Sequence, residues 1–118
     1  MSLNGQHILI LGLGESGLAM ARWCARQGAQ VRVADTRASP PGLTQLQATL
    51  PQAEFISGPF DKNLLGGIDQ LAISPGLSAG QMVVFEARAR GIRVVGEIEL
   101  FAQALRGPQV GWGKLERS

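Results

Sequence analysis

The fold of this chain is decided by one stretch, HILILGLGESGL, which occupies residues 7–18. Its first five residues form a short apolar run, which is typical of a β-strand buried on both faces of a sheet. Three glycines follow in the spacing Gly-x-Gly-x-x-Gly, which is typical of phosphate-binding turns when a strand precedes it and a helix follows. We therefore predict a strand over His7–Leu11 and a helix over Leu18–Gln27, joined by a glycine turn that faces a phosphate or diphosphate.

Strand and helix patterns alternate along the rest of the chain. Further strands are predicted over 31–35, 54–57, 70–73 and 93–95, and helices over 43–50, 81–90 and 97–105, with one helical turn over 61–65. Strands that alternate with helices form parallel sheets with right-handed crossovers. We therefore predict an α/β fold, a Rossmann-like doubly wound sheet of about five parallel strands in the order 3-2-1-4-5.

The length of 118 residues is that of one ordinary domain. We assign residues 1–106 to this domain, because the regular patterns extend that far. Residues 107–118 have no usable periodicity, and we expect them to be a truncated linker or an artificial tail.

The composition excludes several classes of protein. The chain carries 11 Lys and Arg against 9 Asp and Glu, a formal net charge of +2, without a basic block that could follow a phosphate backbone. Nucleic acid is therefore not expected as a partner. The longest apolar run, Ile8–Leu13, is far shorter than the roughly 20 residues of a membrane span, and no basic residue precedes it as in a signal peptide. We expect a cytoplasmic protein without membrane insertion.

Several residues that could carry chemistry are assigned to packing instead. The single cysteine, Cys24, excludes an internal disulfide and cannot form a zinc site by itself. It falls on the sheet-facing side of the first predicted helix, so we place it in the core. Met20, Trp23 and Phe85 are likewise assigned to packing, and no residue is assigned to a metal.

The glycine motif is the first candidate binding site. Gly12 permits a tight turn, Gly14 lets a ligand approach the backbone, and Gly17 lets the helix pack closely. Unpaired amides and the positive end of the helix dipole favour a phosphate at this place. Ser16 can add a hydroxyl donor, whereas the Glu15 carboxylate would repel a diphosphate and is expected to face solvent.

A second candidate lies at the end of the second predicted strand. Asp35 follows Gly17 by 18 residues, where dinucleotide-binding domains place an acid on the ribose diol. Its carboxylate accepts two hydrogen bonds, and the residues alone leave open whether a ribose or the edge of a uracil supplies them. Thr36 comes next, and Arg37 after it is placed equally well to contact a ligand or to lie in solvent.

The turn Ser74-Pro75-Gly76 follows the fourth predicted strand. In the predicted sheet this strand lies beside the first, at the topological switch point where ligands bind in doubly wound folds. Proline fixes such a turn and glycine exposes backbone amides. The turn therefore fits a structural role and a binding role equally well.

No combination of residues forms a catalytic centre. The chain has one histidine and no tyrosine, and it lacks the ATP-binding pattern Gly-x-x-x-x-Gly-Lys-Ser/Thr. The sequence therefore indicates a binding domain. One interpretation is an NAD- or NADP-binding domain of an oxidoreductase, with Asp35 on the ribose and Arg37 on a 2′-phosphate. Another is a non-enzymatic nucleotide-sensing module, although no exposed apolar stripe for a partner is evident in the sequence.

Four segments together resemble the N-terminal domain of the Mur ligases, in particular those that add D-glutamate. The segments are GLGESGL at 12–18, DTR at 35–37 followed by PPGL at 40–43, SPG at 74–76, and GEIELF at 96–101. Their order and spacing cover roughly residues 5–106. The glycine motif is shared with many dehydrogenases, whereas the second and fourth segments are distinctive.

The resemblance implies part of an ATP- and magnesium-dependent ligase that joins D-glutamate to UDP-N-acetylmuramoyl-L-alanine, a peptidoglycan precursor, through an acyl phosphate. It implies that Gly14, Glu15, Ser16 and Gly17 lie along the diphosphate. It also implies that Asp35, Thr36 and Arg37 surround the uracil, and that Ser74 and Gly76 lie beside the ligand. In that family the central domain holds ATP and the C-terminal domain helps to bind the amino acid, and we expect neither domain within these residues. We therefore expect no cofactor in this chain and no ligase activity from it alone.

Overall fold

A computed structural model of the chain describes residues 3–75, 77 and 81–105. Within them, five parallel strands form one sheet in the order β3-β2-β1-β4-β5. The strands are β1 (His7–Leu11), β2 (Gln30–Asp35), β3 (Glu54–Ser57), β4 (Gln70–Ile73) and β5 (Arg93–Gly96). The predicted fold class and strand order are confirmed.

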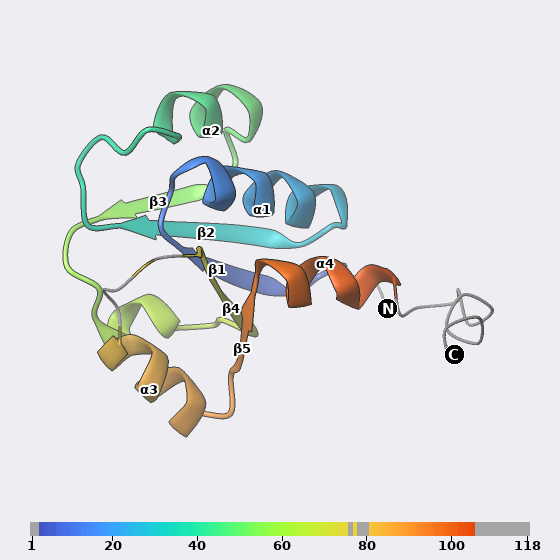
Figure 1. Cartoon of the computed structure of the whole chain (residues 1–118), viewed down its shortest axis with the longest axis vertical. Coiled ribbons are helices and arrows are strands. Elements are labelled where there is room, and N and C mark those ends of the chain that lie inside the picture. Colours follow the sequence, from blue (N-terminus) through green and yellow to red (C-terminus); the bar gives the residue numbers. More distant parts are fainter. Residues whose placement is uncertain (1–2, 76, 78–80, 106–118) are drawn as a thin grey trace.

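Helices cover both faces of the sheet (Figure 1). One face carries α1 (Glu15–Arg26), α2 (Leu43–Thr49) and α4 (Glu97–Leu105), and the other carries α3 (Gln81–Ala89) and the short 3₁₀ helix η1 (Lys62–Leu65). This is the doubly wound arrangement in which the strands are buried on both sides. None of the helices in the described part of the chain combines the length and the apolar character needed to cross a bilayer.

The start of α1 differs from the prediction, whereas the other bounds agree to within one residue. The helix begins at Glu15 inside the glycine motif, three residues before the predicted start at Leu18. Its first turn is closed by the Leu18 amide, which donates to the Gly14 carbonyl at 3.0 Å. The Glu15 carboxylate suits this end of the helix dipole. At the other end, Gly28 takes a left-handed φ of 87°, as expected for a helix stop.

The alternation of side chains along β1 divides the core into two layers. Ile8 and Ile10 pack under α1, α2 and α4, whereas Leu9 and Leu11 pack under η1 and α3. Cys24 is fully buried in the first layer, and this burial raises the pKa of its thiol to about 12. The assignment of Cys24 to the core is confirmed.

Polar and aromatic contacts attach α4 to the rest of the domain. Gln103 of α4 and Gln70 of β4 are both buried, and their side-chain amides exchange hydrogen bonds of 2.8 and 3.1 Å. Gln70 also donates to the Gln6 side chain at 2.6 Å. On the outer part of the helix, the ring of Phe101 meets Trp23 of α1 edge to face, with 5.1 Å between ring centroids. These contacts fix one position for the helix on the sheet.

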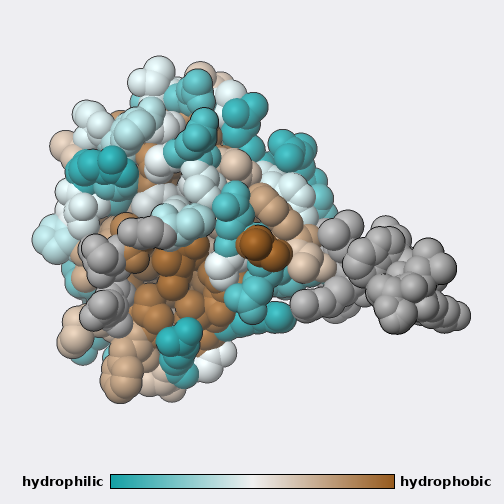
Figure 2. All heavy atoms as spheres, viewed as in Figure 1, coloured by the Kyte–Doolittle hydropathy of each residue, from teal (hydrophilic) through white to brown (hydrophobic). Residues whose placement is uncertain are grey.

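The assignment of Phe85 to packing is wrong. Its side chain is 74% exposed, because Val83 and Ala87 of α3 face the sheet and Phe85 projects from the other side of the helix. Met82, three residues earlier, is 80% exposed, and Ile98 of α4 is 83% exposed. Figure 2 shows apolar side chains gathered on this side of the molecule, near α3 and β5. The structure therefore exposes an apolar area that was not evident in the sequence.

Candidate functional site

The candidate site lies at the carboxyl ends of the central strands. β1 pairs with β2 on one side and with β4 on the other, so the chain leaves this edge in opposite directions. The glycine turn after β1 is tied to both neighbours. The Gly12 amide donates to the Ala34 carbonyl of β2 at 2.8 Å, and the Ser74 hydroxyl after β4 donates to the Gly12 carbonyl at 3.1 Å.

Two glycines of the turn are required by its geometry. Gly12 has a φ of +93°, which L-residues with a side chain rarely adopt. At Gly17, a Cβ would collide with the Gly12 carbonyl oxygen and would lie 3.2 Å from the Ser74 hydroxyl oxygen. These two predicted structural roles are confirmed. Gly14 differs, because a Cβ there would meet nothing within 4 Å, so its predicted role in ligand approach remains a prediction.

The start of α1 offers unpaired hydrogen-bond donors. The amides of residues 14–17 have no backbone acceptor among the described residues, as is usual for the first turn of a helix. The Ser16 hydroxyl is buried, and among the described residues it is the one buried side-chain polar atom without a hydrogen-bond partner. Glu15 is exposed to solvent, as expected. A group with several acceptor oxygens, such as a phosphate, would satisfy these donors.

The Asp35 carboxylate lies buried beside this turn and accepts four hydrogen bonds. Oδ2 accepts from the Leu13 amide and from the Arg37 side chain (Nη2), each at 2.8 Å. Oδ1 accepts from the Arg37 amide at 2.8 Å and from Arg37 Nε at 2.9 Å. Asp35 thus joins the glycine turn to the residues that follow β2.

These contacts fix the charge of the pair. Hydrogen bonding from the Arg37 guanidinium, with further help from the Leu13 and Arg37 amides, lowers the pKa of Asp35 to about 2 although burial opposes this shift. The carboxylate in turn raises the pKa of Arg37. The Asp35 side chain is 4% exposed and that of Arg37 is 54% exposed, so the cation is the member of the pair that reaches solvent.

The structure brings most of the predicted site residues to one edge of the sheet. Gly14–Gly17, Asp35–Arg37 and Ser74 all lie at the carboxyl ends of β1, β2 and β4. Thr36 is exposed there, next to Arg37. Gly76 lies outside the described residues. Leu13 was not predicted as a site residue, but its amide binds Asp35 and its carbonyl accepts from the Gly42 amide at 3.1 Å. Leu13 contributes only backbone groups, which do not depend on the type of residue, so no sequence signal could identify them.

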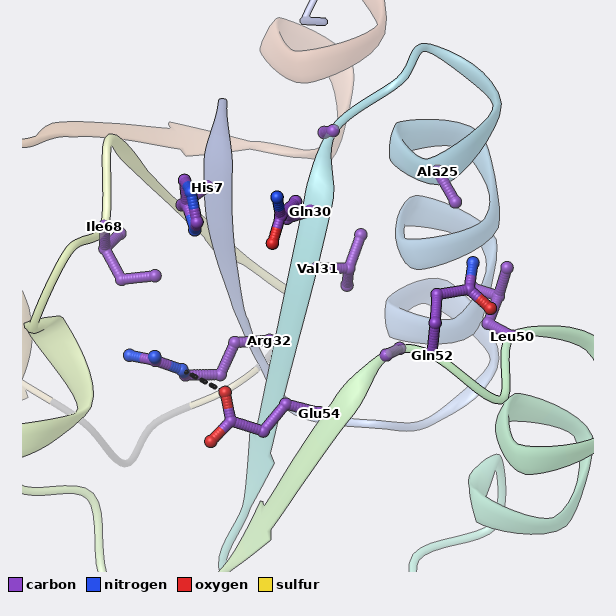
Figure 3. A pocket seen from close by; sticks show the side chains of 11 residues that line it. His7, Ala25, Gln30, Val31, Arg32, Leu50, Gln52, Glu54 and Ile68 are labelled. Carbon is purple, nitrogen blue, oxygen red and sulfur yellow. Dashed lines mark hydrogen bonds and ion pairs between the residues drawn. The ribbon is translucent and has the colours of Figure 1, made fainter. Parts of the chain in front are cut away.

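A cavity of about 350 Å³ lies at the opposite edge of the sheet (Figure 3). Its walls include His7, Gln30 and Glu54, which are the first residues of β1, β2 and β3. Arg32 in this cavity pairs with Glu54 at 2.8 Å and donates to the carbonyls of Leu64 and Gly66 at 2.7 and 3.1 Å. Ligands of doubly wound folds bind at the carboxyl edge, so the glycine turn is the stronger candidate.

Comparisons with known proteins show the family of this chain. The family model described as "Mur ligase MurD-like, N-terminal domain" matches residues 6–96. The protein named UDP-N-acetylmuramoylalanine--D-glutamate ligase from Aromatoleum aromaticum is 55% identical over 104 residues, which cover 88% of this chain and 22% of that protein. The protein of the same name from Cupriavidus pinatubonensis is 59% identical over 108 residues, which cover 87% of this chain and 21% of that protein.

The chain therefore spans about a fifth of the length of these curated relatives. Among solved structures, the precorrin-2 dehydrogenase SirC superposes with a TM-score of 0.60 at 16% identity, over 80% of this chain and 45% of that chain. This likeness concerns the fold alone.

Proposed function

The chain belongs to the MurD-like family of Mur ligase N-terminal domains, and from this premise we propose that it binds the UDP part of UDP-N-acetylmuramoyl-L-alanine. The observation that supports this most strongly is the buried Ser16 hydroxyl without a partner, next to the unpaired amides of residues 14–17. A diphosphate supplies the acceptor oxygens that these donors lack. The positive end of the α1 dipole adds to the attraction.

The remaining predicted site residues take the rest of the nucleotide in this proposal. Thr36 and Arg37 lie within the same edge and are accessible, so they are placed to contact the uracil beside the diphosphate. Asp35 supports them from its buried position. Ser74 lies after β4, on the other side of the glycine turn, and in this proposal Ser74 and Gly76 contact the ligand there. Glu15, which is exposed, leaves the diphosphate free of a facing carboxylate.

The chemistry of amide-bond formation belongs, in this proposal, to other domains of a longer cytoplasmic enzyme. Among the described residues no group of three His, Cys, Asp or Glu side chains could hold a metal ion. The glycine turn also lacks the lysine of ATP-binding loops. We propose that ATP, magnesium and D-glutamate bind to those other domains, and that this chain alone releases no ADP when it is mixed with these reactants and the precursor.

The test is a titration of the ¹⁵N-labelled chain followed by NMR, with UDP, UDP-N-acetylmuramoyl-L-alanine, NAD and NADP in parallel. The proposal expects the UDP ligands alone to shift the amide signals of residues 14–17 and Thr36. A Ser16→Ala variant should weaken UDP binding by about tenfold or more, because one hydrogen bond to a charged group is lost. Shifts with NAD or NADP alone would favour the oxidoreductase interpretation, and no shift with any ligand would refute binding by this chain.

A further inference from the structure

The buried carboxylate of the site has no acceptor position left for a ligand. An ionised carboxylate offers about four lone-pair positions. All of them are used by Asp35, which accepts from the Leu13 amide, the Arg37 amide, Arg37 Nε and Arg37 Nη2 at 2.8–2.9 Å. A ribose hydroxyl or a ring N–H could reach this carboxylate only by displacing one of these donors.

Arg37, the partner of Asp35 in the ion pair, still has hydrogen-bond donors free for a ligand. A guanidinium carries five N–H donors, and Asp35 occupies one at Nε and one at Nη2. The other three have no acceptor among the described residues, and the Arg37 side chain is half-exposed at the carboxyl end of β2. Bidentate pairing holds a guanidinium in one plane, so these free donors point in a fixed direction.

We propose that Asp35 is a positioning residue of the UDP site, which fixes the Leu13 amide of the glycine turn and aims Arg37 at the ligand without contacting the ligand itself. This inference rests on the proposed function, and it assigns direct recognition of the nucleotide to Arg37. It differs from the dinucleotide-binding arrangement, in which the acid at this position accepts the ribose hydroxyls.

Different substitutions affect the two proposed roles of Asp35, which are to hold the Leu13 amide and to position Arg37. In Asp35→Asn, the side-chain oxygen can still accept from the Leu13 amide, while the new NH₂ group faces the Arg37 amide and Nε, which are also donors. This variant therefore keeps the glycine turn but turns a donor toward the Arg37 amide and Nε and removes the charge of the ion pair, so that of these contacts only Arg37 Nη2 keeps an acceptor, the Asn oxygen. Asp35→Ala removes both contacts. Arg37→Met removes the guanidinium and leaves both carboxylate contacts with backbone amides.

The first measurement needs no ligand. The Arg37 Nε–Hε signal in an NMR spectrum should be resolved and slow to exchange in the wild-type chain, and in Asp35→Asn it should move to the position of solvent-exposed arginines. Arg26→Met, at the far end of α1, serves as the control for a lost arginine and should leave the Arg37 signal unchanged. An Arg37 signal that is the same in the wild type and in the Asp35→Asn variant would overturn the proposal.

The second measurement is a double-mutant cycle on UDP affinity. Arg37→Met should weaken binding about tenfold, since hydrogen bonds from a charged donor are among the stronger ones. Asp35→Asn should weaken it no further than Arg37→Met does, and the double variant should stay within about twofold of Arg37→Met. If Asp35 contacted the ligand, the two effects would multiply, to roughly a hundredfold, and the proposal would be wrong.

The two experiments distinguish failure of the proposed function from failure of the positioning role of Asp35. If the wild-type chain does not bind UDP, the proposed function fails, and with it the ligand-directed part of this inference. The Arg37 Nε signal then still decides whether Asp35 positions Arg37. If the wild type binds UDP and the cycle is multiplicative, the proposed function stands and only the positioning role of Asp35 is refuted.

Discussion

Replacing Gly17 by alanine should destabilise the domain, although alanine is normally the better helix residue. A Cβ at this position would collide with the Gly12 carbonyl oxygen and crowd the Ser74 hydroxyl at 3.2 Å. The Gly12 carbonyl cannot move freely, because it accepts a hydrogen bond from the Ser74 hydroxyl and the Gly12 amide donates to Ala34. The added methyl group must therefore shift the backbone of the glycine turn or the start of α1.

The magnitude follows from two opposing effects. Forcing a methyl group into a packed place costs up to about 3 kcal/mol, and the upper end applies because the obstacle is backbone. Replacing glycine by alanine within a helix returns up to about 1 kcal/mol. The net loss in the free energy of unfolding is about 2 kcal/mol, which lowers Tm by roughly 8 °C in a domain of this size.

Gly14→Ala is the matched control, because it adds the same methyl group three residues away. A Cβ at Gly14 meets nothing within 4 Å, and its φ of −97° is open to alanine. Its unfolding free energy should stay within about 1 kcal/mol of the wild type, the usual scale of a helix N-cap change. The methyl group would instead occupy the approach to the amides and weaken UDP binding. Thermal and urea unfolding of the wild type and both variants measure the free energies of unfolding. A Gly17→Ala chain as stable as Gly14→Ala would refute the packing argument.

Two further predictions concern buried polar groups. The folded pKa of Asp35 is about 2 against a usual value of 3.8, so the stability that its ionisation provides, roughly 2 kcal/mol, should be complete above about pH 4 and lost as the pH falls toward 2. Urea unfolding from pH 7 to pH 2.5 should therefore show the difference between wild type and Asp35→Asn shrinking below pH 4, and a constant difference would contradict this. Gln103→Leu should cost about 1–3 kcal/mol because the buried Gln70 side-chain oxygen loses its donor. The double variant Gln70→Leu/Gln103→Leu should recover part of that loss, whereas additive costs in urea unfolding would count against the buried amide pair.

The sheet could be predicted because its determinants are local. Apolar runs bounded by glycine and proline mark the strands, and the handedness of parallel crossovers leaves few possible orders. The start of α1 could not be predicted in the same way. Its first residues, Glu15–Gly17, include poor helix formers, and their helical shape depends on contacts of the glycine turn with Ala34 and Ser74, which are distant in sequence.

The sequence predicted where Asp35 lies but not which groups it contacts. The spacing of Asp35 after the glycine motif places an acid at the switch point, and the structure has it there. Sequence spacing carries no information on where the Arg37 side chain turns, so the pairing that occupies the carboxylate could not be foreseen. The prediction for Phe85 failed for a related reason, since only the packing of Val83 and Ala87 determines which side of α3 faces the sheet.

The contacts around the glycine turn order the place where we propose that a diphosphate binds. The Gly12 amide binds Ala34, and the Gly12 carbonyl accepts from Ser74. The Leu13 amide binds Asp35, and the Leu13 carbonyl accepts from Gly42. These bonds hold the turn from β2, from β4 and from the start of α2. The amides of residues 14–17 that come next have no backbone acceptor among the described residues and point from a fixed helix end. The diphosphate of the proposed ligand would meet donors that are already ordered, so little conformational entropy would be lost on binding.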